Sequence, residues 1–66
     1  MKFETNSQFI EFIKSERRNQ HITQSELARK CGLNQQHISL IETGKVVPSL
    51  VVAIRILAAL GYIFIC

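Results

Sequence analysis

Residues able to catalyse a reaction or bind a metal are few in this sequence and lie far apart. The two cysteines, Cys31 and Cys66, show no C-x-x-C spacing, so neither a structural zinc site nor a disulfide framework is expected. The two histidines, His21 and His37, have no second ligand or nucleophile beside them, and we expect both at the surface. A glycine-rich phosphate loop and paired carboxylates are also missing. We therefore expect no enzyme activity, no metal and no cofactor.

The centre of the chain instead carries the signals of a short helix. Thr23 and Glu26 form an S/T-x-x-E capping box, in which each side chain accepts from the other residue's free backbone amide. Gly32 suits the left-handed conformation that ends many helices. These signals predict a helix over about residues 24–31.

A second short helix is expected directly after this one. Asn34 is a suitable N-cap, Ile38 and Ile41 mark a buried side three residues apart, and Gly44 marks the end. The sequence thus predicts two helices joined by a glycine-containing turn, over about residues 23–44. This arrangement is a helix-turn-helix.

An amphipathic helix is predicted before this motif. It should begin near Ser7, or one turn earlier if Thr5 and Gln8 form the capping pair, and it should end at about residue 19. Phe9 and Ile13 recur at helical spacing and should form its inner stripe.

A more apolar helix is predicted after the motif, over about residues 50–60. Pro48 excludes helix before it, Ser49 caps it and Gly61 ends it. The expected core positions are Leu50, Ala53, Ile56, Leu57 and Leu60. A second apolar face remains, made of Val51, Ile54 and Ala58. A helix that is apolar nearly all round is buried on more than one side.

The residues after Gly61 favour a short β-strand with two apolar faces. They are Tyr62, Ile63, Phe64, Ile65 and Cys66. The simplest partner for this strand is its copy in a second subunit around a two-fold axis, with residues 50–66 forming the interface. The alternative is a tail packed against the first helix.

Size and charge set the broad class. The 66 residues predict one domain, 1–66, with all-α structure of four to five helices plus the terminal strand. So small a domain is marginal alone, and its 47% hydrophobic content suggests that a partner covers apolar surface. The net charge of +3 and the pI near 9.2 are compatible with a polyanion partner.

A membrane location is the alternative to a cytoplasmic one. Residues 50–66 contain Arg55 as their only charge, but a central arginine costs about 2.5–3.5 kcal/mol on insertion scales. No signal peptide is recognisable at the N-terminus. We therefore expect a cytoplasmic protein that does not bind membranes.

The stretch TQSELARKCGLNQQHISLIETGK, residues 23–45, resembles the helix-turn-helix of the phage repressor and Cro (XRE) family. The resemblance extends from about Ile13 to Leu60, with further matches at Arg17 and in the Pro48-Ser49-Leu50 segment. The Leu60-Gly61 ending followed by an apolar strand is similar to HipB-like antitoxins, which dimerise through that strand.

The resemblance implies a role for the second helix of the motif. Family members insert this helix into the major groove with its N-terminal residues at base edges. The expected base-reading residues are Gln35, Gln36, Ser39 and Leu40. Glutamine can bond to adenine N6 and N7 together, which is worth about 1–3 kcal/mol of discrimination. Leu40 could touch a thymine methyl group or belong to the core.

The resemblance also implies phosphate contacts and an internal ion pair. The expected phosphate-binding residues are Gln24, Thr43, Lys45 and Arg18, although Arg18 could equally be solvated. The family counterparts of Arg17 and Glu42 form an ion pair that links the first helix of the domain to the reading helix.

The expected function is therefore that of a sequence-specific DNA-binding regulator, a homodimeric repressor that binds double-stranded operator DNA. The alternative is an antitoxin that binds a toxin protein and represses its own operon. The expected dimer interface consists of Val51, Ile54, Ala58, Tyr62, Ile63, Phe64 and Ile65.

Overall fold

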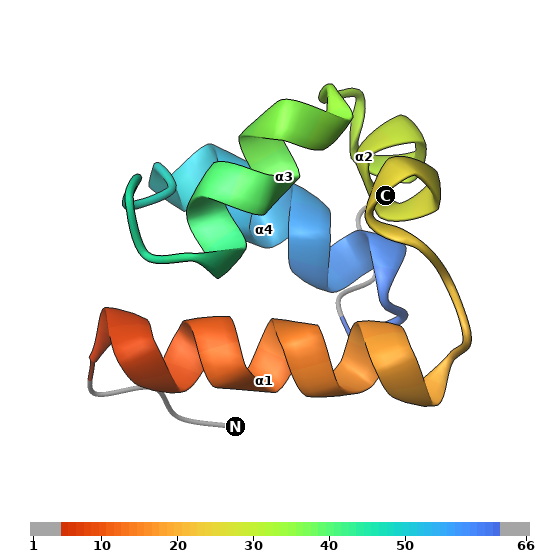
Figure 1. The fold of residues 1–66 in the computed structure, drawn as a ribbon, viewed down its shortest axis with the longest axis horizontal. Helices are drawn as coiled ribbons and strands as arrows, with labels where there is room; N and C mark the ends of the chain where they lie inside the picture. Colours follow the sequence, from red (N-terminus) through yellow and green to blue (C-terminus); the bar gives the residue numbers. More distant parts are fainter. Residues whose placement is uncertain (1–4, 63–66) are drawn as a thin grey trace.

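The computed structural model describes residues 5–62, which form four α-helices (Figure 1). They are α1 (Asn6–Asn19), α2 (Gln24–Cys31), α3 (Gln35–Glu42) and α4 (Leu50–Ala59). The expected all-α class is confirmed for this part of the chain, and residues 5–62 contain no strand. The strand expected after Gly61, including Ile63, Phe64 and Ile65, lies outside the described residues apart from Tyr62.

Each helix begins at a short polar side chain that accepts a backbone hydrogen bond. The four N-caps are Thr5, Thr23, Asn34 and Ser49. The capping box is complete, because Glu26 N donates to Thr23 Oγ1 (3.1 Å) and Thr23 N donates to Glu26 Oε1 (2.9 Å). These hydrogen bonds lower the pKa of Glu26. With Thr5 as its N-cap and Gln8 N as the donor to it, α1 begins at Asn6, one residue before Ser7.

The turn between α2 and α3 needs a residue with positive φ. Gly32 has φ +73° there, and Leu33 N donates to Ala28 O (2.9 Å) to close the end of α2. After α1 the corresponding position is taken by His21, with φ +57°. Side chains rarely adopt this conformation, so the α1–α2 turn contains local backbone strain.

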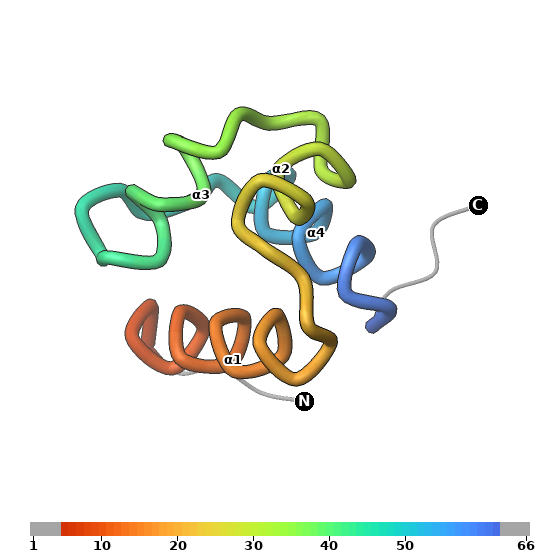
Figure 2. Tube along the Cα trace, turned by 45° about the vertical axis from the view of Figure 1, so that its right-hand side comes forward, coloured from red at the N-terminus to blue at the C-terminus, as the bar shows by residue number. Residues whose placement is uncertain are grey.

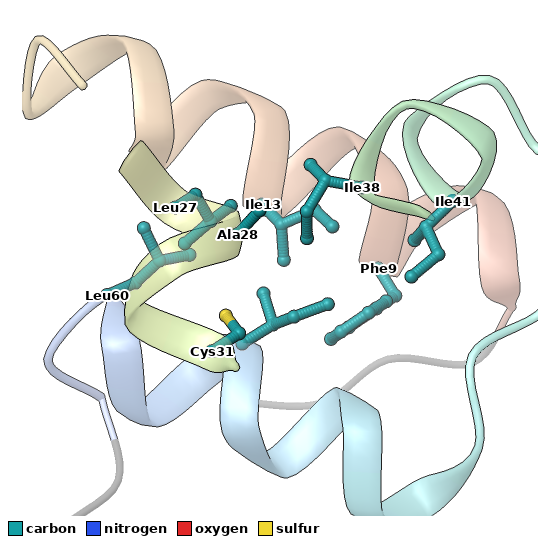
Figure 3. Close-up of a cluster of buried hydrophobic side chains, with 9 residues drawn as sticks. Phe9, Ile13, Leu27, Ala28, Cys31, Ile38, Ile41 and Leu60 are labelled. Atoms are coloured by element: carbon teal, nitrogen blue, oxygen red, sulfur yellow. The ribbon is translucent and has the colours of Figure 1, made fainter. Parts of the chain in front are cut away.

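The core lies where the four helices meet. Figure 3 shows that side chains from α1, α2 and α3 point toward one another and toward Leu60. The buried cluster is Phe9, Ile13, Leu27, Ala28, Cys31, Ile38, Ile41, Ile56 and Leu60. α2 packs against α3 and α4, while α1 packs against α3 and lies to one side of the other helices (Figures 1 and 2). Cys31 is buried as a small apolar side chain, and burial raises the pKa of its thiol.

α4 faces the core with four of its five expected positions, since Ile56 and Leu60 are buried and Ala53 and Leu57 pack against the core. Its first turn differs from the prediction. Leu50 was expected in the core, but 77% of it is exposed. Ile56 and Leu60 are buried and Val52 packs against the core, which gives an inner side spaced by four residues. At about 100° per residue, Leu50 points about 120° away from Ile56. With apolar residues all round the helix, the sequence pattern does not show that its first turn lies outside the core.

The described helices also bear on the membrane alternative. The longest of them, α1, has 14 residues and is amphipathic, and α4 has only 10 residues. No helix within residues 5–62 combines the length and the apolar character that crossing a bilayer requires.

Candidate nucleic-acid interface

The outer side of α3 is polar, and buried side chains on the opposite side of the helix hold it in place. Ile38 and Ile41 are fully buried, and they hold one side of α3 against the body of the domain. Gln35 and Gln36 lie exposed at its N-terminal end. Because a packed inner side fixes the outer one, these two amides project from a rigid support.

Ser39 and Leu40 lie further along α3 and are half-buried. Within residues 5–62, Leu40 is not among the partly buried side chains that pack against the core cluster. Its apolar surface therefore borders the outer side of α3, next to the two glutamines.

Arg17 and Glu42 form an ion pair between α1 and α3. Arg17 Nε lies 2.9 Å from Glu42 Oε2, and Arg17 Nη2 lies 3.2 Å from Glu42 Oε1. Arg17 Nη1 donates to Ile22 O (3.0 Å). The two side chains are only 13% and 3% exposed, so the bidentate pair joins α1, the α1–α2 turn and α3 away from solvent.

Gln24 extends this pair toward the surface. Its Nε2 donates to Glu42 Oε1 (3.0 Å), and its Oε1 accepts from Gln35 Nε2 (2.9 Å). Arg17, Glu42, Gln24 and Gln35 thus form a continuous series of hydrogen-bonded side chains, here called the polar chain. It runs from the interior to the exposed end of α3.

The four expected phosphate-binding residues have different surroundings. Gln24 is half-buried and its amide is used at both ends within the polar chain. The Thr43 hydroxyl lies within hydrogen-bond distance of Ser39 O (3.0 Å) and Leu40 O (3.2 Å), so its proton is used internally and its lone pairs stay open. Lys45 and Arg18 are exposed.

The charges of the described residues leave a surplus of unpaired cations. The described acids are engaged: Glu42 with Arg17, Glu11 with Lys14 (3.6 Å), Glu26 in its capping box and Glu16 with Tyr62. By contrast, five basic residues in the 5–62 range form no ion pair there: Arg18, Arg29, Lys30, Lys45 and Arg55. This surplus favours an anionic partner.

A second distinctive surface lies on α4 and the loop before it. Val47 and Leu50 are 71% and 77% exposed, and Val51 is 59% exposed. Ile54 and Ala58 continue this side at helical spacing and are half-buried. We call these five residues the outer face of α4. Such a row of uncovered apolar side chains is typical of an interaction surface.

Tyr62 was expected at a subunit interface and has neighbours within its own chain. Its ring meets the Phe12 ring edge-on, with centroids 5.0 Å apart and planes at 71°. Interaction with the Glu16 carboxylate raises the pKa of Tyr62. Nearby, Gln20 Nε2 donates to Leu60 O (2.8 Å) at the end of α4. Part of Tyr62 is therefore committed to α1.

Sequence reasoning missed the links made by two glutamines. Gln24 and Glu42 are 18 residues apart, and Gln20 and Leu60 are 40 apart. No local pattern connects residues at such separations, because only the packing of helices brings them together. No group of His, Cys, Asp or Glu in residues 5–62 could hold a metal ion.

Comparisons with known proteins agree with this geometry. The helix-turn-helix family matches residues 13–62. An uncharacterized HTH-type transcriptional regulator of Methanothermobacter thermautotrophicus is 43% identical over 49 residues, covering 74% of this chain and 71% of that protein. No solved structure matches the chain significantly.

Proposed function

This chain belongs to the XRE family of helix-turn-helix proteins, and we propose that it is a homodimeric repressor that reads operator DNA with α3. DNA-binding transcriptional regulation is the function that the family and the related HTH-type regulator support. The observation that carries the proposal is the exposed Gln35–Gln36 pair on a helix whose opposite side is fully buried. Such a regulator acts in the cytoplasm.

Base reading in this proposal rests on the outer side of α3. The Gln36 amide is exposed and has no hydrogen bond to another side chain within residues 5–62, so both of its edges are available to a base. Gln35 reads the neighbouring base, and Leu40 offers an apolar contact to a thymine methyl group. Ser39 supplies a hydroxyl beside them.

Phosphate binding would place α3 in the groove. Lys45 follows α3 directly and is exposed without an ion pair to residues 5–62, which makes it the main salt-dependent contact. Thr43 can accept or share a hydrogen bond there. Gln24 stands at the N-terminus of α2, where backbone amides favour an anion, and Arg18 adds a positive charge from α1.

Two features support the proposed dimer, namely the size of the domain and the outer face of α4. The domain measures 27 × 26 × 22 Å, whereas half-sites lie about 34–36 Å apart, so one copy cannot place a reading helix in both. On the outer face of α4, Val47, Leu50 and Val51 are exposed within residues 5–62. Around a two-fold axis this face would meet its own copy, together with Tyr62, Ile63, Phe64 and Ile65.

Two substitutions separate base reading from phosphate binding. Gln36→Ala should reduce the preference for operator over random DNA by about 1–3 kcal/mol and leave the salt dependence unchanged. Lys45→Ala should weaken binding to all sequences alike and reduce the slope of log affinity against log salt by about 0.9. Titration of labelled operator and random duplexes at several salt concentrations measures both. Unchanged operator preference in Gln35→Ala/Gln36→Ala would overturn the assignment of α3.

The antitoxin alternative uses the same DNA-binding residues and a different occupant for the outer face of α4. A toxin protein, in place of a second copy, would then cover Val47, Leu50 and Val51. Co-purification with the product of a neighbouring gene distinguishes the two. Loss of that complex in Val51→Asp would place the toxin on this face.

A further inference from the structure

We infer that Tyr62 is a positioning residue for operator binding, because it fixes the proposed subunit interface relative to the reading helix. The consequence is that the dimer accepts one spacing between half-sites and rejects others. This inference rests on the proposed function, since only a dimer has two reading helices to space.

The first step is the turn that ends α4. Gly61 has φ +92° there. Gly61 N donates to Ala58 O (3.0 Å), and Tyr62 N donates to Leu57 O (2.9 Å). These two hydrogen bonds form a Schellman motif. The backbone of Tyr62 is therefore held at a defined place on the end of α4.

The second step is the contact of this end with α1, beside which it lies in Figures 1 and 2. Phe12, Glu16 and Gln20 follow one another at four-residue spacing, so they lie on one side of the helix. The Phe12 ring meets the Tyr62 ring edge-on, with centroids 5.0 Å apart. The Tyr62 hydroxyl donates to the Glu16 carboxylate. Gln20 Nε2 donates to Leu60 O (2.8 Å). We call these three contacts the clasp.

The third step connects the clasp to the reading helix. The neighbouring side of α1 carries Ile13, which is fully buried, and Arg17, which forms the bidentate ion pair with Glu42 of α3. One helix of 14 residues thus holds α3 with one side and the end of α4 with another. α1 therefore fixes the position of this end relative to α3.

Tyr62 contributes to this connection more than to the core. It is 41% exposed, and within residues 5–62 it is neither in the buried cluster nor among the side chains packed against it. Without the clasp, Ile56 and Leu60 would still anchor α4 by their burial. Removal of the clasp should therefore leave the domain folded and free the direction of the end of α4.

In the proposed dimer this constraint acts twice. The interface includes the outer face of α4 and the residues from Tyr62 onward, so a fixed end of α4 gives the two reading helices one separation and one rotation about the DNA. One added base pair changes these by about 3.4 Å and about 34–36°. A rigid two-site binder reaches its highest effective concentration only where its span matches the sites. The clasp should therefore make binding depend on the half-site spacing.

The test removes the clasp from the side of α1, which lies outside the proposed interface. Glu16→Ala/Gln20→Ala deletes two of the three contacts. Glu11→Ala/Asn19→Ala is the matched control, because it also removes one carboxylate and one amide, at exposed positions of α1 outside the clasp. Thermal unfolding confirms that each variant is folded.

Affinity is measured for duplexes with one half-site, with two half-sites at the spacing enriched from a random DNA pool, and with that spacing changed by one base pair in either direction. The wild type should bind the enriched spacing at least about tenfold more tightly than either changed spacing. In Glu16→Ala/Gln20→Ala this ratio should fall below about threefold, while the affinity for one half-site stays within about twofold of the wild type. The control should keep the wild-type ratio.

Three results would overturn the inference: an unchanged ratio in Glu16→Ala/Gln20→Ala, an equal fall in the control, or an equal loss of affinity for one half-site. The last would make the clasp a support of α3 itself. If the wild type binds two half-sites no more tightly than one, the proposed dimer itself fails.

Discussion

The outer sides of α3 and α4 differ in chemistry, although both helices pack on the same core. α3 presents glutamine amides, and one of them is oriented by the polar chain. α4 presents valine and leucine side chains that nothing within residues 5–62 covers. An oriented polar group can select a partner by hydrogen bonding, whereas an uncovered apolar row gains free energy from being buried by any complementary surface. This contrast supports the proposal that α3 provides specificity and α4 provides association.

The two ends of α4 show the same contrast within one helix. Its C-terminal end is held by the buried Ile56 and Leu60 and by the hydrogen bond from Gln20 to Leu60 O. Its first turn, with Leu50 and Val51, is exposed. The fixed end thus positions the uncovered end, which can serve as a rigid interface.

Breaking the ion pair should have the largest effect on stability. Arg17→Met leaves the Glu42 carboxylate buried with Gln24 as its remaining side-chain donor. We expect the free energy of unfolding to fall by about 3–5 kcal/mol, as for other broken buried pairs. Urea denaturation followed by circular dichroism measures this. Arg18→Met is the control, since Arg18 is exposed and should change stability by less than about 0.5 kcal/mol. Equal losses in the two variants would contradict the bracing role of the pair.

A charge on the outer face of α4 should affect association and spare the fold. Val51→Asp places an acid in the first turn of α4, where the helix dipole favours it, so monomer stability should change by less than about 0.5 kcal/mol. Two like charges facing each other across a two-fold axis should weaken dimerisation at least about tenfold. Sedimentation equilibrium measures the association constant. A Val51→Asp protein as dimeric as the wild type would show that this face is not the interface.

Removing the cap at the fixed end of α4 should have a smaller effect. Gln20→Ala deletes the hydrogen bond to Leu60 O, which should cost about 0.5–1.5 kcal/mol of unfolding free energy. Asn19→Ala, at the neighbouring exposed position, provides the comparison. If both variants unfold at the same urea concentration as the wild type, the end of α4 is held by packing alone.

The smallest expected change is a gain in stability. His21→Gly should remove the backbone strain of the positive φ after α1. The free energy of unfolding should rise by about 0.5 kcal/mol, because the strain removed exceeds the entropy that glycine adds to the unfolded chain. Gly32→Ala, at the matching position after α2, should destabilise by about 1 kcal/mol because its φ is also positive. Thermal unfolding of both variants tests whether the two substitutions shift the melting temperature in opposite directions. Two shifts of the same sign would contradict the strain assigned to His21.

The helices could be predicted from the sequence because their boundaries depend on local chemistry. Thr23 with Glu26, Gly32 and Asn34 each act on neighbouring amides, and the structure contains the cap or turn expected at each. The Arg17–Glu42 pair was expected from the family resemblance alone, and the structure contains it.

Two features depended on tertiary structure and were not predicted. The exposure of Leu50 depends on where the other helices lie, since Leu50 and Ile56 are equally apolar. The contacts of Gln24 arise because α2 and α3 bring Gln35 and Glu42 to either side of one amide. Sequence spacing predicts only contacts within a helix or turn.

Selection of bound duplexes from a random DNA pool tests most directly the claim that α3 reads bases as one half of a dimer. The wild type should enrich an inverted repeat whose half-sites are centred about 10–10.5 base pairs apart. Gln36→Ala should lose the preference at one position in each half-site and keep the spacing. Failure to enrich any sequence, or the same enriched sequence from Gln35→Ala/Gln36→Ala, would contradict the account.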